Sequence, residues 1–160
     1  VLARLDAENN AMQAFTADDV PGALASVGQG LAVAVDDPRL LILQGIFQDL
    51  LARPPAAQQS FVRAQAVLND PESFYLLRAQ LYLTTNQPNP AEADARAALA
   101  VNDNSARGWL LLGQALEAQD RREEALTAYN RAADLALTSG DDEVVVISRL
   151  AIGRMSGAIP

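Results

Sequence analysis

The chain contains no cysteine, no histidine and no lysine, so all 12 of its basic residues are arginines. Without histidine it lacks a side chain that transfers protons readily near neutral pH, and without cysteine it lacks a thiolate nucleophile and a soft metal ligand. Without lysine it cannot form a Schiff base. Catalysis would have to rest on carboxylates, hydroxyls or arginine. We therefore expect no enzyme, no cofactor and no metal site.

Long apolar runs and positive net charge are missing as well. No run approaches the roughly 20 apolar residues that span a bilayer, and no signal-peptide pattern opens the chain. The net charge of −8 opposes binding to a phosphate backbone, so we expect no nucleic-acid partner. The lack of cysteine leaves the compartment open, with the cytoplasm favoured over the periplasm or a membrane-anchored soluble domain. Because the chain begins at Val1 and not at Met, we interpret it as a processed or excised product.

Aromatic residues are scarce, at 5% of the chain, whereas half of the residues are apolar, and alanine and leucine are abundant. This composition favours close packing of helices over a sheet, in which β-branched and aromatic residues would dominate. The 160 residues are enough for one sizeable core or a short array of repeated units. We predict an all-α protein.

A repeat of 34 residues runs through the sequence. Its clearest unit is 106–139, and stepping back by 34 residues aligns small side chains at two positions. The second-helix position holds Ala125, Ala91, Ala57 and Ala23, and the first-helix position holds Gly113, Ala79, Gly45 and Ala11. Small residues are expected where two helices approach closely. We predict one domain of four helical hairpins, at 4–37, 38–71, 72–105 and 106–139.

The unit at 106–139 resembles the tetratricopeptide repeat, whose pattern is W-x2-L-G-x2-Y followed by A-x3-F. The residues that carry the resemblance are Trp109, Leu112, Gly113, Ala125, Tyr129 and Ala132. The unit departs from the pattern at Leu116, where Tyr is usual, and at Leu137, where Pro is usual. The first three units match the repeat pattern poorly at individual positions, and their assignment depends on the 34-residue register that they share with the fourth unit. The resemblance implies a right-handed superhelix of antiparallel helix pairs that binds another protein.

Capping residues mark the predicted helix boundaries. Asp37-Pro38, Asp70-Pro71 and Asn104-Ser105 can each cap a new helix, and Asn89 with Glu92 forms a loose capping box for the second helix of the third unit. Asp141, Asp142 and Glu143 suit the start of a capping helix at about 141–154. We interpret the acid pairs at 18–19, 36–37 and 141–142 as helix caps, because none belongs to a calcium-binding loop.

The resemblance also places a concave groove, lined by the second, fifth, ninth and twelfth residues of each unit. These positions are Leu5, Glu8, Met12 and Phe15; Arg39, Ile42, Ile46 and Asp49; Ser73, Leu76, Gln80 and Leu83; and Arg107, Leu110, Gln114 and Glu117. All of them except Leu5, Glu8 and Glu117 form the predicted partner-binding groove.

The segment 40–51 is apolar on nearly every side, unlike an ordinary surface helix. Either neighbouring repeats cover its second face, or a partner peptide or helix does. Members of the family that bind chaperone tails hold a terminal carboxylate with lysine and asparagine, and this chain has no lysine. Arg39 or Arg107 could bind a carboxylate, but we expect the groove to select shape and apolar side chains.

We therefore predict a protein-interaction scaffold that binds a peptide or partner helix. The alternatives are a structural module that self-associates as a homodimer, and an accessory domain of a larger assembly, secretion or biogenesis factor. Trp109 is expected to pack between the helices of its own unit. The stretch 28–33 begins like a dinucleotide-binding motif but lacks its final glycine, and we interpret Gly30 as a close-packing residue.

Overall fold

The computed structural model describes residues 2–157, which contain nine α-helices and no strand. The all-α prediction is therefore confirmed. The chain divides into two compact units, Val1–Asp70 and Pro71–Pro160, and we describe each by itself. The single four-hairpin superhelix stays a prediction.

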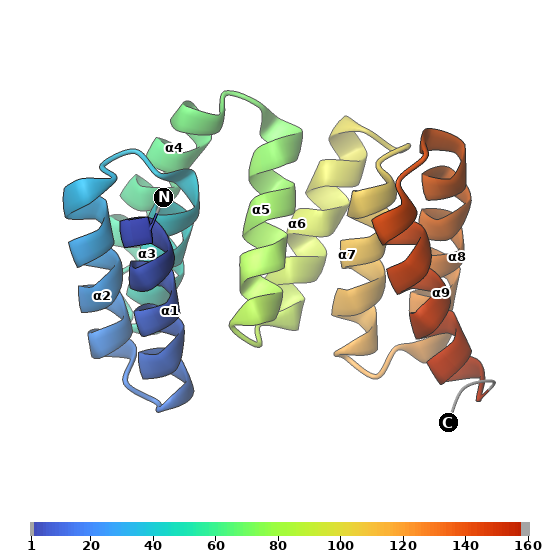
Figure 1. Ribbon diagram of the computed structural model, residues 1–160, viewed down its shortest axis with the longest axis horizontal. Coiled ribbons are helices and arrows are strands. Elements are labelled where there is room, and N and C mark those ends of the chain that lie inside the picture. The colour runs from blue at the N-terminus through green and yellow to red at the C-terminus, as the bar shows by residue number, and fades with distance from the viewer. Residues whose placement is uncertain (1, 158–160) are drawn as a thin grey trace. The chain divides into compact units, whose positions relative to one another are not determined.

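The first unit consists of two helical hairpins (Figure 1). Its helices are α1 (Leu2–Thr16), α2 (Val20–Val33), α3 (Pro38–Leu50) and α4 (Pro54–Leu68). α1 packs on α2, α3 packs on α4, and α2 joins the two hairpins by packing on α3. The turns within the hairpins contain Asp18 and Ala52 at φ values of 62° and 56°, a left-handed conformation that ends a helix.

The second unit has two hairpins and one further helix. Its helices are α5 (Pro71–Thr84), α6 (Pro88–Val101), α7 (Ala106–Glu117), α8 (Arg122–Ser139) and α9 (Asp142–Ser156). α5 pairs with α6, α7 pairs with α8, and the hairpins stack through α6 and α7. α9 occupies the stretch for which a capping helix is predicted, and it packs mainly on α8. The hydrophobic core of the second unit is continuous and includes Leu112, Leu116, Tyr129, Val144 and Met155.

Small residues lie where the helices approach closely, as the repeat predicted. A Cβ atom on Gly30 would lie 2.5 Å from the Cβ atom of Ala7, and one on Gly113 would lie 2.8 Å from the ring of Tyr129. Real Cβ contacts are longer, so a larger residue would push the helices apart. Close packing thus explains Gly30, as expected, without a nucleotide.

Helix caps account for several of the predicted boundaries. The side chains of Asp37, Ser105 and Asp141 accept hydrogen bonds from backbone N–H groups of the first turn of α3, α7 and α9, and Asp19 does the same for α2. Each cap satisfies a donor that would otherwise lack a partner at the helix start. The interpretation of the acid pairs as helix caps is confirmed at Asp19, Asp37 and Asp141.

The predicted capping box at Asn89 is wrong. α6 begins at Pro88, and its N-cap is Gln87, whose side chain makes no capping hydrogen bond. Proline suits the first helical position because its φ angle is already helical and its missing N–H would have no partner there. Glu92 instead accepts hydrogen bonds from Arg96 and Arg121.

The interiors of three hairpins differ in polarity at equivalent positions. In the α3–α4 hairpin, Ser60 donates a hydrogen bond to Gln44 at 2.9 Å. The residues 34 positions later are Arg78 and Asp94, which form a bidentate ion pair with both N–O distances at 2.7 Å. A further 34 positions along, the same places hold Leu112 and Ala128, both buried. One repeat geometry therefore holds a neutral polar pair, an ion pair and an apolar pair in turn.

Candidate functional site

A hollow of about 100 Å³ lies between α5, α7 and α9 in the second unit. Its lining consists of Gln80 from α5; Arg107, Leu110, Leu111 and Gln114 from α7; and Glu143, Val144 and Ile147 from α9. Its volume corresponds to about three water molecules, which suits one side chain of a partner and not a whole helix.

Four of the predicted groove residues meet at this hollow. Arg107, Leu110 and Gln114 lie three and four residues apart, a spacing that puts them on one face of α7. Gln80 comes from the equivalent place one repeat earlier, 34 residues before Gln114. Positions predicted from the resemblance, on two helices that are distant in sequence, thus lie together in the structure.

The third wall was missed by the sequence prediction. α9 was expected only to cover the end of the array, yet it contributes Glu143, Val144 and Ile147 to the hollow. The Val-Val-Val-Ile run at 144–147 was the one available signal, because it makes α9 apolar on more than one side. Val144 and Val145 are buried, whereas Ile147 is half-buried at the hollow.

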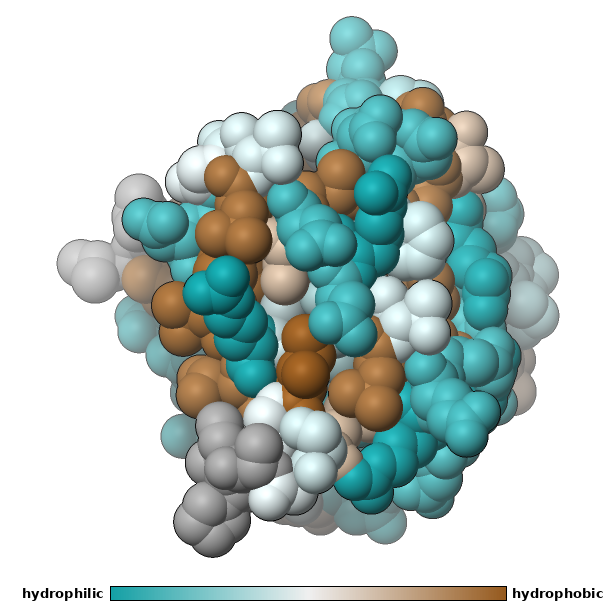
Figure 2. Space-filling view, turned by 90° about the vertical axis from the view of Figure 1, so that its right-hand side faces the viewer, coloured by the Kyte–Doolittle hydropathy of each residue, from teal (hydrophilic) through white to brown (hydrophobic). Residues whose placement is uncertain are grey.

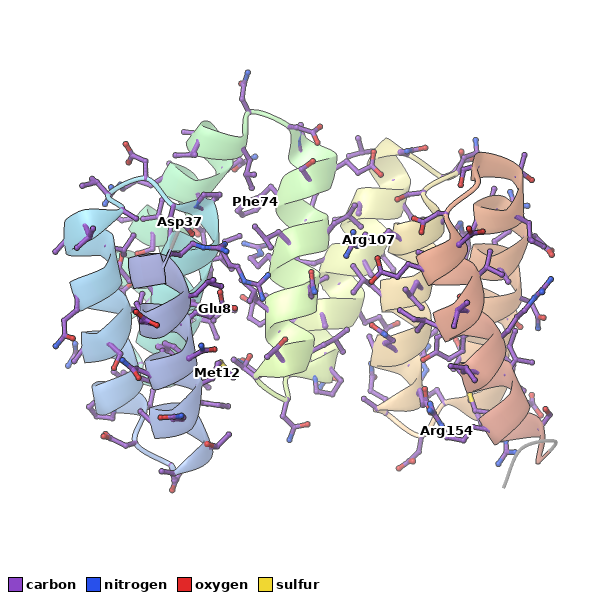
Figure 3. The ribbon with its side chains drawn as sticks, in the orientation of Figure 1. Glu8, Met12, Asp37, Phe74, Arg107 and Arg154 are labelled. Atoms are coloured by element: carbon purple, nitrogen blue, oxygen red, sulfur yellow. The ribbon has the colours of Figure 1, made fainter. Side chains whose placement is uncertain are left out.

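The polar groups around the hollow are free to bind a partner. Among the residues that the structure describes, the side chains of Gln80 and Gln114 make no hydrogen bond, and Arg107 makes no ion pair. Arg107 is exposed on α7, as Figure 3 shows. Each glutamine amide offers a donor and an acceptor, and Arg107 adds a cation with a forked set of donors.

In the first unit, the predicted groove residues are mostly occupied by contacts within the chain. Arg39 donates a hydrogen bond to Glu8 at 2.6 Å, which joins α3 to α1 beside a weaker ion pair between Arg4 and Asp37 (Figure 3). Phe15 packs on Phe47, with the ring centroids 5.6 Å apart. Met12 is half-buried and lines a shallow hollow on α1.

Ile42 and Ile46 have no exposed surface at all. Of the two explanations for the apolar segment 40–51, this burial favours cover by the chain itself at these two residues. Neither side chain can contact a partner in this conformation.

The other predicted groove residues divide by exposure. Asp49 and Ser73 are exposed. Leu76 and Leu83 are half-buried and pack against the core of the second unit. Leu76 and Leu83 therefore keep some exposed surface, whereas Leu110 on α7 is only 5% exposed.

Two residues near the site have structural roles. Trp109 is half-buried and packs against the core of the second unit, and its indole N–H donates a hydrogen bond to the carbonyl oxygen of Asp103 at 2.9 Å. Glu117 accepts hydrogen bonds from the Tyr129 hydroxyl and from Arg154. Burial, followed by the hydrogen bond to Glu117, raises the pKa of Tyr129 above its ordinary value. The residue therefore stays a neutral donor.

No helix within residues 2–157 combines the length and the apolar character needed to cross a membrane.

Comparison with known proteins gives one family match. A model described as "Tetratricopeptide repeat" matches residues 106–138, which comprise α7 and α8 as far as Thr138. No curated protein sequence matches the chain.

Several solved structures are similar to the chain at low identity. One is "MamA 41-end from Desulfovibrio magneticus RS-1", at 16% identity and a TM-score of 0.46, covering 98% of this chain and 96% of that one. Another is the first TPR domain of the human RPAP3 protein, at 20% identity and a TM-score of 0.47, covering 76% of this chain and 97% of that one. A third is YrrB, described as "a TPR protein with an unusual peptide-binding site", at 15% identity and a TM-score of 0.43, covering 93% of this chain and 84% of that one.

The family match falls on the unit that resembles the repeat most closely by sequence, and the structure folds that unit as the expected helical hairpin. Residues 106–138 therefore match the tetratricopeptide repeat in sequence and form a helical hairpin within an all-α chain.

Proposed function

We propose that this chain is a protein-interaction scaffold, and that the hollow between α5, α7 and α9 receives an apolar side chain of a partner segment. Tetratricopeptide repeats are protein-interaction modules and not enzymes, which agrees with the class predicted from the sequence. The observation that carries the proposal is the meeting of Gln80, Arg107, Leu110 and Gln114 at one hollow.

The floor of the hollow suits an apolar side chain. Leu110 and Val144 are buried with a small exposed remainder, and Ile147 is half-buried beside them. Covering such surface releases water and favours binding by about 25 cal/mol per Å². Because the hollow is small, it selects a side chain by size, in line with the expected preference for shape over charge.

The two glutamines suit the backbone of an extended segment. Gln80 and Gln114 occupy the same position of consecutive repeats, so their amides lie on the same side of the unit. Amide side chains without a protein partner can pair with the N–H and C=O groups of a bound peptide. Arg107 lies at the rim together with Glu143, which places a cation and an anion beside the entering side chain.

The test compares two double variants of the same chemistry. Gln80→Ala with Gln114→Ala removes both amides from the hollow, whereas Gln58→Ala with Gln59→Ala removes two exposed amides from α4 in the first unit. Proteins captured from the native source are identified by mass spectrometry, and the affinity of each for the purified variants is then measured by calorimetry. We expect the hollow variant alone to bind at least one partner about tenfold more weakly.

A second pair of variants probes charge. Arg107→Glu reverses the charge at the rim, and Arg131→Glu makes the same change at an exposed position of α8 that does not line the hollow. If every captured partner binds the Gln80/Gln114 variant and Arg107→Glu as tightly as the two controls, while circular dichroism shows unchanged helicity, the hollow is not the binding site.

A further inference from the structure

The outer face of α9 has exposed apolar residues among charged ones and carries no covering helix among the described residues. Val146 and Leu150 lie four residues apart, on the side of α9 opposite to its buried residues, and each side chain is 55% exposed. Leu137 at the end of α8 is also exposed. Figure 2 looks onto this end of the second unit and shows apolar side chains among hydrophilic ones. Single exposed apolar residues are common, whereas the pair Val146 and Leu150 on one helix face offers apolar area that a second helix can cover.

We propose that this face binds the same face of a second copy of the chain, with the two α9 helices antiparallel. The inference does not require the hollow between α5, α7 and α9 to bind a partner, although Glu143 belongs to both surfaces, and it commits to a self-complementary contact.

The order of charges along α9 is the first reason for this occupant. Asp142 and Glu143 are exposed in the first turn and Arg154 is exposed in the last turn, whereas the exposed Arg149 lies at the middle of the helix. A helix that fits this face must therefore carry basic residues opposite the acidic end and acidic residues opposite the basic end. α9 itself meets this requirement when it runs in the opposite direction, which also opposes the two helix dipoles favourably.

The positions of the side chains around the helix give the second reason. Glu143 and Arg154 are 11 residues apart, and 11 steps of about 100° bring Arg154 to within about 20° of Glu143. Both therefore lie on the same flank of the exposed face. Their midpoint falls between residues 148 and 149, and the midpoint of Val146 and Leu150 falls at 148.

A twofold axis near residue 148 satisfies both sets of contacts. It places Val146 of one copy against Leu150 of the other, and Glu143 of one copy against Arg154 of the other. Gly153 lies on the same face and lets the helices approach closely. Arg154 already donates to Glu117 within its own chain, and its side chain is exposed enough to reach a second carboxylate.

The contact is small, so we expect weak association. α9 has 15 residues and a length of about 22 Å, and one helix face of that length buries less area than a standard stable interface. The dimer should therefore form at high protein concentration.

The first test measures self-association by sedimentation equilibrium over a wide concentration range. We expect the average mass of the wild type to rise toward that of a dimer. Leu150→Arg should weaken association about tenfold or more. Val101→Arg is the matched control, because Val101 is 53% exposed on α6 and away from this face, and it should leave association unchanged. A wild type that stays monomeric throughout, or a Leu150→Arg variant that associates as the wild type does, overturns the proposal and leaves the face to another partner.

The second test reads the direction of the helices by cross-linking. Because the chain has no cysteine, single cysteines introduced at Glu143 and Arg154 can be joined by a short bismaleimide without background. In the antiparallel pair, a mixture of the two variants cross-links faster than either alone, since like positions lie about 16 Å apart along the axis. Faster linkage within each variant alone, or equal linkage with a Val101→Cys control, contradicts the antiparallel contact.

Discussion

Replacement of Asp94 by alanine tests the ion pair inside the α5–α6 hairpin. The Asp94 side chain is 6% exposed and the Arg78 side chain 20%, and two N–O distances of 2.7 Å join them. Asp94→Ala leaves the guanidinium of Arg78 buried beside the rings of Phe74 and Tyr82 without this carboxylate. Removing one member of a buried pair typically costs 3–5 kcal/mol. Partial solvent access to Arg78 puts our expectation at about 3 kcal/mol.

The next repeat supplies the matched control. Leu112 and Ala128 occupy in the α7–α8 hairpin the places that Arg78 and Asp94 occupy in the α5–α6 hairpin. The double variant Arg78→Leu with Asp94→Ala therefore copies a pair that this fold already accommodates. It loses the cation–π contact of Arg78 with Phe74, at 4.7 Å, which is worth about 1 kcal/mol. We expect the double variant to be about 2 kcal/mol more stable than Asp94→Ala.

The assay is urea unfolding followed by the fluorescence of Trp109, which is the only tryptophan and lies in the same compact unit as the ion pair. Circular dichroism at the same urea concentrations checks that helix loss coincides with the fluorescence change. An Asp94→Ala variant that loses less than about 1 kcal/mol, or a double variant no more stable than the single one, would refute the reasoning.

Three further predictions concern packing, pH and a buried hydroxyl. Gly30→Ala should lower the free energy of unfolding by about 1–3 kcal/mol, because the new methyl group would meet Ala7, whereas Gly28→Ala, with open space around it, should raise it by about 0.5–1 kcal/mol in the same urea assay. Burial would raise the pKa of Glu92, but hydrogen bonds from Gln119, Arg96 and Arg121 lower it below 4.5. A carboxylate whose pKa is lowered in the folded state stabilises the protein above about pH 4.5, and this stabilisation is lost as the pH falls through the pKa of the folded state. The difference in unfolding free energy between wild type and Glu92→Gln should therefore shrink below pH 4.5. A difference that stays constant from pH 7 to pH 3 would contradict this. Ser148→Ala should raise the melting temperature, because the Ser148 hydroxyl is fully buried with no hydrogen-bond partner in the described part of the chain, and a lowered value would show that the hydroxyl is satisfied.

The sequence alone determined the features that depend on local chemistry. The recurrence of small residues predicted where helices touch, as at Gly113 against Tyr129, because only a small side chain fits between close backbones. Caps such as Asp37 and Ser105 predicted helix starts, because the cap and the donors it satisfies are adjacent in the chain. The capping box predicted at Asn89 was wrong because Pro88 and Pro90 can each occupy the first position of a helix, and the helix begins at Pro88.

Tertiary structure alone decided how distant positions combine. Periodicity placed Ile42 and Gln114 on equivalent faces, but only the packing around each left Gln114 at a hollow and Ile42 with no exposed surface. The same holds for the role of α9, because the rotation of that helix about its own axis, set by its contact with α8, determines whether Ile147 lines a site and Val146 faces outward. A repeat pattern specifies which residues share a helix face, but the exposure of that face depends on neighbours that lie far away in the sequence.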